Sequence, residues 1–190
     1  MATTIKIIEQ FNESIKHIQR AFDSSKQGDI ANAQKELEKS STCIYQVIEW
    51  AVKNVLLSIY NNPSLHNTEI AIIEGFSFPP KITLFEKSVT PSLSSIGISS
   101  KVILDLKKTV RNLPEHSGFI PHYSSLIKVV QEAEKLILNY IDSNAILNKI
   151  PVADSTEIPT DESWSEFYNA CDSFNKYKNY ILLIGPNGEF

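Results

Sequence analysis

Apolar residues in the first sixty positions of the chain recur every three or four residues, which is the spacing of one face of an α-helix. The first run predicts a helix that extends to about residue 27, after which Gly28 and Asp29 supply a stop and a cap for the next helix. The second run predicts a long helix that ends before Pro63. Because the break between them is so short, the two helices are expected to pack antiparallel as an α-hairpin. The inward positions are Ile8, Phe11, Ile15, Ile18 and Phe22 in the first helix and Ile30, Ala33, Leu37, Ile44, Ile48, Ala51, Val55 and Ile59 in the second.

Residues 61–98 are rich in proline, glycine, serine and threonine, and this composition predicts a long loop between the second and third helices. One short helix is expected within the loop, near residues 67–75. A third helix should begin at Ser99 or Ser100, which are good caps, and end or kink at Pro114. Its inward positions are Val102 or Ile103, Leu106, Val110 and Leu113.

A fourth helix is predicted to begin at about Pro121, and no helix-breaking residue follows until the 140s. Four amphipathic helices in this order predict an all-α fold, a four-helix up-down bundle that spans residues 1–149. The inward positions of the fourth helix are Tyr123, Leu126, Val130, Ala133, Ile137 and Ile141.

The last part of the chain, residues 150–190, is expected to be an appendage that packs on the bundle. Its net charge is −5, whereas residues 1–149 carry +1, so the acidity of the protein (net charge −4) lies in this part. A polar linker is predicted first, then a fifth helix, then an apolar tail at residues 180–184. The aromatic residues of the fifth helix are expected to be core rather than a platform for stacking bases. The inward positions of that helix are Trp164, Phe167, Cys171 and Phe174.

The composition places the chain among globular proteins. Its 190 residues are 42% hydrophobic and 21% charged, which excludes a disordered or low-complexity chain and leaves room for one buried core. No apolar run approaches the ~20 residues that span a bilayer, and the first residues lack the apolar region of a secretory signal. We therefore expect a cytoplasmic protein without a membrane-embedded part.

Neither the cysteines nor the histidines predict a metal site. Cys43 and Cys171 lie far apart in the sequence and are interpreted as reduced, buried thiols. There is no CxxC pair and no HxxxH spacing among the four histidines. We expect no metal and no cofactor.

One short motif carries candidate chemistry. Arg111, one of only two arginines in the chain, is followed by Asn112 and then by His116 in the sequence RNLPEH. The motif lies at the end of the third predicted helix, just before the fourth. Several lysines near Arg111 form either a basic patch for nucleic acid or an ordinary solvated helix face. These lysines are Lys101, Lys107 and Lys108.

At this point the sequence resembles the HEPN superfamily of all-helical domains, whose signature is an arginine, a polar residue that is often asparagine, further residues and a histidine. The stretch IYQVIEWAVKNVLL at residues 44–57, with Glu49 before an apolar pair and Lys53, is similar to the second helix of that family. The resemblance covers about residues 5–143. A simple ion pair between Glu49 and Lys53, one helical turn apart, explains that part of the pattern better than a functional role does.

The resemblance implies a metal-independent endoribonuclease, a toxin or defence effector that acts on RNA. It implies that His116 transfers protons, that Arg111 stabilises the charge on the phosphorane, and that Asn112 orients the histidine or a phosphate. The products would be a 2′,3′-cyclic phosphate and a 5′-hydroxyl. It also implies a homodimer through the third and fourth helices, with an antitoxin or regulatory protein as a possible partner.

Two other interpretations stay open from the residues alone. A non-catalytic HEPN-like helical module would bind a nucleotide, a nucleic acid or a partner protein, and the net charge of −4 favours this class over a nuclease that grips polyanions. A purely structural helical adaptor would make the motif accidental, with Arg111 and His116 as surface or capping residues near a helix C-terminus.

Overall fold

A computed structural model describes residues 2–61, 67–75, 77–106 and 123–151. All of them belong to one compact unit, Met1–Ile158. The described residues are mostly helical and include no strand, so the all-α prediction is confirmed. Within this part of the chain, no helix is both long enough and apolar enough to span a bilayer.

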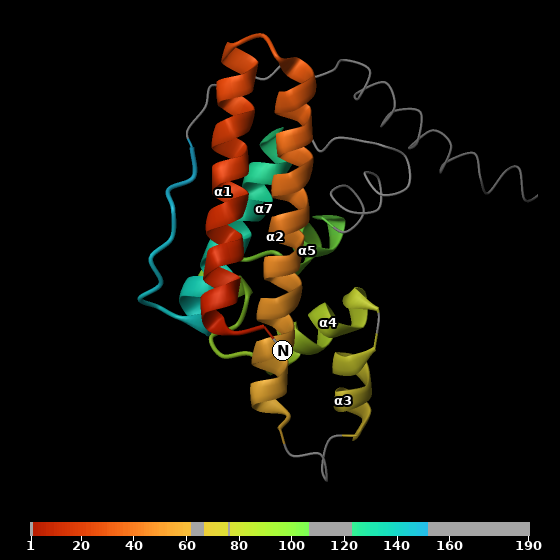
Figure 1. Cartoon of the computed structure of the whole chain (residues 1–190). Coiled ribbons are helices and arrows are strands. Elements are labelled where there is room, and N and C mark those ends of the chain that lie inside the picture. The colour runs from red at the N-terminus through yellow and green to blue at the C-terminus, as the bar shows by residue number, and fades with distance from the viewer. Residues whose placement is uncertain (1, 62–66, 76, 107–122, 152–190) are drawn as a thin grey trace, which may run out of the picture. The chain divides into compact units, whose positions relative to one another are not determined.

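The two longest helices form the predicted hairpin. Helix α1 spans Thr4–Lys26 and helix α2 spans Ile30–Ile59, and the two run antiparallel side by side (Figure 1). Gly28 adopts a left-handed φ of 78° in the turn, a conformation that glycine adopts without strain. The Asp29 side chain then caps α2 by accepting a hydrogen bond from the Asn32 backbone N–H at 3.1 Å. Both boundary residues therefore act as the sequence predicted.

Helix α2 is the central helix of the described part, because it contacts five other elements. These are α1, α3 (Asn67–Glu74), α4 (Phe78–Ser88), α7 (Tyr123–Leu136) and the π-helical turn η3 (Ile137–Ile141). More than one of its faces is therefore buried, and the single inward face predicted for it is wrong at its C-terminal end. Val52 and Leu56 are fully buried there, whereas Ile59 is 42% exposed. In α1 the buried face begins at Ile7 rather than Ile8, which is half-buried.

The predicted long loop at residues 61–98 is wrong, because most of that segment is helical. The short helix expected there is present as α3, Asn67–Glu74, but a second helix, α4, spans Phe78–Ser88. Pro79 and Pro80 occupy the first turn of α4, where backbone N–H groups have no helical partner and proline is tolerated. A 3₁₀ turn, η1, follows at Ser94–Ile96. The residues that anchor this segment in the core are Ile73, Phe78, Ile82, Phe85, Val89 and Leu93.

The third and fourth predicted helices are confirmed where the structure describes them; the end predicted for the third helix at Pro114, with its inward positions Val110 and Leu113, lies outside the described residues. Helix α5 spans Ser100–Leu106 and helix α7 spans Tyr123–Leu136, continued by η3 at Ile137–Ile141. Helix α5 contacts α4 and α7, and α7 contacts α2. The inward residues that the structure confirms are Ile103 in α5 and Leu126, Val130, Ala133 and Ile137 in the fourth helix.

After η3 the chain continues as an extended segment, residues 142–151, which runs along α1 (Figure 1). Asn12 of α1 binds this segment through its side-chain amide. Its Nδ2 donates to the Ile146 carbonyl at 3.2 Å, and its Oδ1 accepts from the Asn148 backbone N–H at 2.7 Å. The fifth helix and the tail predicted for residues 164–184 lie outside the described residues, so their packing on the bundle stays a prediction.

Candidate functional site

The residues of the RNLPEH motif, Arg111, Asn112, Pro114 and His116, lie outside the described residues. The structure does describe the helices on either side of the motif. The described residues of helix α5 reach Leu106, those of helix α7 start at Tyr123, and the two helices contact each other. The motif therefore belongs to the connection between two packed helices, while its own geometry stays a prediction.

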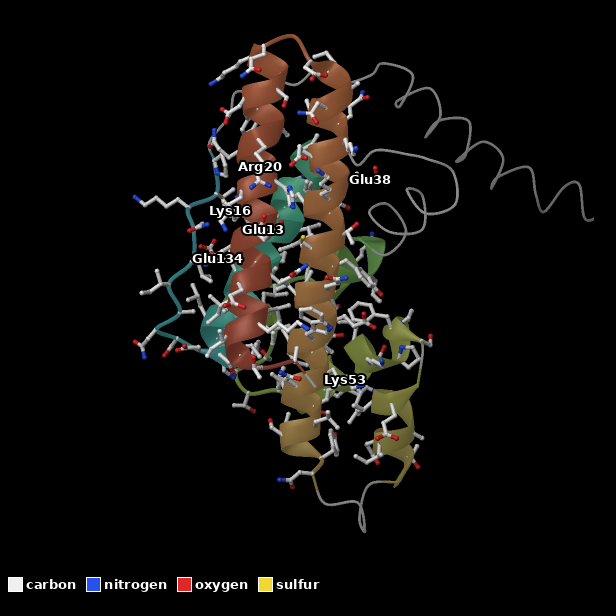
Figure 2. All side chains as sticks on the ribbon, viewed as in Figure 1. Glu13, Lys16, Arg20, Glu38, Lys53 and Glu134 are labelled. Atoms are coloured by element: carbon white, nitrogen blue, oxygen red, sulfur yellow. The ribbon has the colours of Figure 1, made fainter. Side chains whose placement is uncertain are left out.

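The other residues tied to the HEPN resemblance are on α2. Glu49 and Lys53 are both half-buried, and Figure 2 shows Lys53 on the lower half of α2. Within the described ranges no ion pair joins these two side chains, so the simple pair expected from their spacing is absent there. Lys101, the first lysine of the candidate basic patch, is exposed on α5.

A series of polar pairs crosses the interface between α1 and α2. Ser14 Oγ lies 2.8 Å from Ser40 Oγ, and both side chains are fully buried. Buried polar groups of this kind fix the register of two helices, because sliding one helix past the other leaves them unpaired. The other pairs are Gln10 with Gln46, His17 with Glu36 and Ser24 with Asn32.

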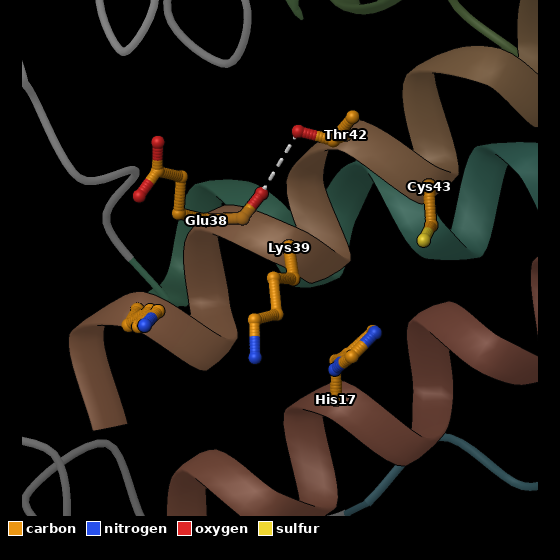
Figure 3. Close-up of a pocket in the computed structure, with 6 residues that line it drawn as sticks. His17, Glu38, Lys39, Thr42 and Cys43 are labelled. Atoms are coloured by element: carbon orange, nitrogen blue, oxygen red, sulfur yellow. Dashed lines mark hydrogen bonds between the residues drawn. The ribbon is translucent and has the colours of Figure 1, made fainter. Parts of the chain in front are cut away.

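A pocket of about 360 Å³ lies beside the His17–Glu36 pair. Figure 3 shows its chemistry: Lys39 and Cys43, about one turn apart on α2, both point toward the His17 ring on α1. The Thr42 hydroxyl donates to the Glu38 carbonyl at 3.2 Å, within α2. The residues that line the pocket are His17, Lys35, Glu38, Lys39, Thr42 and Cys43.

Glu36 holds the His17 ring in place. The distance from His17 Nδ1 to Glu36 Oε2 is 2.6 Å, and the side chains are only 12% and 7% exposed. Burial alone raises the pKa of Glu36, but hydrogen bonds from Lys39 and His17 outweigh burial and lower that pKa below its ordinary value. An ionised carboxylate can only accept, so Nδ1 carries the proton and donates it to Glu36. Nε2 is then the nitrogen of His17 that is left for another group.

A second carboxylate lies on the far side of the ring. Glu13 Oε1 is 3.8 Å from His17 Nε2, too far for a hydrogen bond, and Glu13 Oε2 accepts from Lys16 Nζ at 2.9 Å. Figure 2 shows Glu13, Lys16 and Arg20 along one face of α1. The hydrogen bond from Lys16, helped by the nearby charges and opposed by desolvation, lowers the pKa of Glu13. Both carboxylates near His17 are therefore ionised at neutral pH.

Cys43 does not act as a nucleophile in this arrangement. Burial raises the pKa of the Cys43 thiol, and the negative charge of Glu13 raises it further. The thiolate is the reactive form, so this cysteine stays protonated and packs as a small apolar group. It is buried and free, as the sequence predicted for it. Among the described residues, no group of three or more His, Cys, Asp or Glu side chains is arranged to hold a metal ion.

No family model, no curated protein and no solved structure matches this chain. The HEPN resemblance therefore rests on the residues quoted above, and the site must be argued from its own geometry.

Sequence reasoning did not identify the His17 pocket, although a signal was present. The apolar face of the second helix has a gap between Leu37 and Ile44, which is filled by polar residues at the inward spacing. Ser14 and His17 lie at the edge of the apolar face of the first helix. Polar residues that interrupt the same face on two antiparallel partners indicate a buried polar pair.

Proposed function

We propose that the protein is a metal-independent endoribonuclease of the HEPN type, with Arg111, Asn112 and His116 as its site. The observation that carries the proposal is the packing of α5 against α7, the two helices that the motif connects. Residues on both helices, Ile103 and Leu126, are buried in the core, so the two ends of the connection are anchored. In this proposal α1, α2, α5 and α7 are the counterparts of the four HEPN helices.

The chemistry requires few groups, because RNA carries its own nucleophile. His116 would take the proton of a 2′-hydroxyl or protonate the 5′-oxygen that leaves. The Arg111 guanidinium would stabilise the extra negative charge on phosphorus, and the Asn112 amide would orient the histidine or a phosphate oxygen. The 2′-oxygen bonds to phosphorus as the bond to the 5′-oxygen breaks, which leaves a 2′,3′-cyclic phosphate and a 5′-hydroxyl.

The proposal includes a homodimer. In the HEPN arrangement, the helices that correspond to α5 and α7 face their copies in the partner, and both Arg/His pairs line one cleft. A nuclease of this kind would serve as a toxin or defence effector on cellular RNA, and an antitoxin or regulatory protein would restrain it.

The experiment is incubation of the purified protein with total RNA in excess EDTA, followed by identification of the product ends. We expect cleavage by the wild type with cyclic-phosphate ends, and a loss of about 100-fold or more in Arg111→Ala and in His116→Ala. Arg20→Ala is the matched control, since Arg20 is the only other arginine, is 55% exposed and pairs with Glu13 at 3.6 Å. His66→Ala is the control for the histidine.

Cleavage that requires a metal ion, or that survives in both motif variants, contradicts the proposal. A folded dimer that cleaves no RNA would favour the second candidate, a non-catalytic helical module that binds nucleic acid, a nucleotide or a partner protein. The net charge of −4 is the observation that favours this second candidate. Its signature is salt-sensitive RNA binding without cleavage.

A further inference from the structure

The pocket between α1 and α2 contains the imidazole of His17, whose Nδ1 is fixed by a hydrogen bond and whose Nε2 lies 3.8 Å from Glu13 Oε1. Glu36 holds Nδ1 of His17 at 2.6 Å, and Nε2 has no hydrogen-bond partner in the part of the chain that the structure describes. A buried carboxylate that fixes the orientation of a histidine is a recurrent feature of histidines that bind ligands or transfer protons.

Lys39 adds donors beside the Glu36 carboxylate that fixes His17. Its ammonium contacts Glu36 Oε1, but the side chain is 45% exposed, so the contact leaves N–H groups of the ammonium available. Figure 3 shows the Lys39 side chain extending toward His17 from α2. Lys35 also lines the pocket, whereas the Thr42 hydroxyl already donates to the Glu38 carbonyl. Among the lining residues, two ammonium groups therefore stand against the one carboxylate of Glu38.

Apart from these polar groups, most of the pocket wall is apolar. The methylene stems of Lys35 and Lys39, the methyl group of Thr42 and the protonated thiol of Cys43 supply apolar contact. A volume of about 360 Å³ is near the lower end of the range for small-molecule sites, roughly 300–1,000 Å³.

We propose that this pocket binds a small molecule that carries a phosphate or carboxylate group on an apolar body. Lys35 and Lys39 contact the anionic oxygens, the apolar body lies against the His17 ring, Cys43 and the lysine stems, and Glu36 is a positioning residue that orients the His17 ring and the Lys39 ammonium. The inference does not rest on the proposed ribonuclease, because none of these residues belongs to the Arg111–His116 motif.

The surrounding charge favours a small ligand over a polyanion. Lys16 and Arg20 lie near the pocket on α1, but both are paired with Glu13, at 2.9 and 3.6 Å (Figure 2). A site that attracts RNA needs unpaired cations spread over a surface. Here recognition depends on a few local hydrogen bonds, which suits a single anionic group.

The test is a titration of the full chain with three probes: inorganic phosphate, adenosine 5′-monophosphate and benzoate. Histidine-selective NMR follows the imidazole signals, with His17→Asn identifying the signal of His17, and calorimetry gives Kd. We expect saturable binding that shifts the His17 signal, with affinities of millimolar order or better. The phosphate and carboxylate probes separate the two possible sources of the anionic group.

Two lysines provide a matched comparison. Lys39 and Lys16 each pair with a glutamate three residues earlier, but only Lys39 lines the pocket. Lys39→Gln should weaken binding about tenfold or more, Lys39→Arg should restore most of it, and Lys16→Gln should change it less than about twofold. Circular dichroism of each variant checks that it is folded.

Three results would overturn the inference. One is that none of the probes shifts the His17 signal at about 10 mM, a concentration that would reveal even weak binding. Another is an equal loss of affinity in Lys39→Gln and Lys16→Gln. The third is that a short RNA shifts the His17 signal and the small probes do not, which would assign the pocket to nucleic acid.

Discussion

The two sides of α2 are built differently. Toward α1, the interface contains the polar pairs of Ser14 with Ser40 and of His17 with Glu36, both largely buried. Toward α4, contact is centred on aromatic rings, with Tyr45 and Phe78 at 5.9 Å between ring centroids. Phe85 of α4 also packs edge-on against Tyr140 of η3, at 5.4 Å.

The apolar and the polar contacts of α2 differ in what they contribute to the free energy of unfolding and to the register of the helices. Apolar contact contributes free energy in proportion to the area buried, and it tolerates small shifts of one helix against another. Buried polar pairs contribute less net free energy, but each is costly to leave unpaired and so fixes one register. The same pairs also place His17 and Lys39 beside a pocket, which an apolar interface would not do.

The largest effect is expected on the aromatic side. Phe85 is 1% exposed, and Phe85→Ala should lower the free energy of unfolding by about 3–5 kcal/mol, because it removes a buried ring and leaves a cavity. Urea denaturation followed by circular dichroism measures the change. A loss below about 1 kcal/mol would contradict the claim that the Phe85 ring is a closely packed part of the core.

The second largest loss of stability is expected when the Glu36 carboxylate between α1 and α2 is removed. Glu36→Ala leaves His17 and Lys39 without their shared acceptor and should cost about 2 kcal/mol. Glu38 is the matched control, since it is exposed on the same helix two residues away and should change stability by less than about 0.5 kcal/mol. Equal effects in the two variants would show that the buried pair contributes nothing specific.

In the wild type, the stabilisation by these carboxylates should depend on pH, and this change is expected to be smaller than the loss in Glu36→Ala. The folded-state pKa values of Glu13 and Glu36 are lowered, so their contribution is present above the unfolded value near 4.5 and is lost as pH falls through the folded values. Urea midpoints measured from pH 7 down to pH 3 should therefore fall below about pH 4.5, and less steeply in Glu36→Gln. Identical slopes in both proteins would argue against ionised Glu36 in the fold.

The smallest effect is expected at the serine pair. Ser14→Ala should cost about 1 kcal/mol, because the Ser40 hydroxyl loses its buried partner at 2.8 Å. The double variant Ser14→Ala with Ser40→Ala should cost less than the sum of the two single changes, since it removes both polar groups. Strict additivity in this double-mutant cycle would show that the two hydroxyls are not coupled in solution.

The sequence predicted the parts of the fold in which local pattern and tertiary packing agree. The α1–α2 hairpin was predicted because its apolar spacing, Gly28 and Asp29 all indicate the same structure. Helix α4 was missed because Pro79 and Pro80 suggest a loop, although proline at a helix start costs little. Its helical state depends on burial of Phe78, Ile82 and Phe85, which are contacts with distant residues that local composition does not reveal.

The two candidate sites also differ in how far they can be predicted from the sequence. A motif of Arg111, Asn112 and His116 can be read from sequence because its residues are close together. The pocket at His17 joins residues from two helices about twenty positions apart, and only the antiparallel register brings them together. Glu36 and Lys39 also look like ordinary surface charges until the packing of α1 is known.

The most direct test of the proposed ribonuclease mechanism compares two RNA substrates of the same wild-type protein. The wild type is incubated in excess EDTA with an RNA that it cleaves and with the same sequence carrying a single 2′-deoxy sugar on the 5′ side of the cleaved bond. The proposed chemistry uses that 2′-hydroxyl as the nucleophile, so cleavage at the modified position should disappear while other positions remain sensitive. Cleavage of both substrates at the same position would contradict the account, because water would then be the nucleophile.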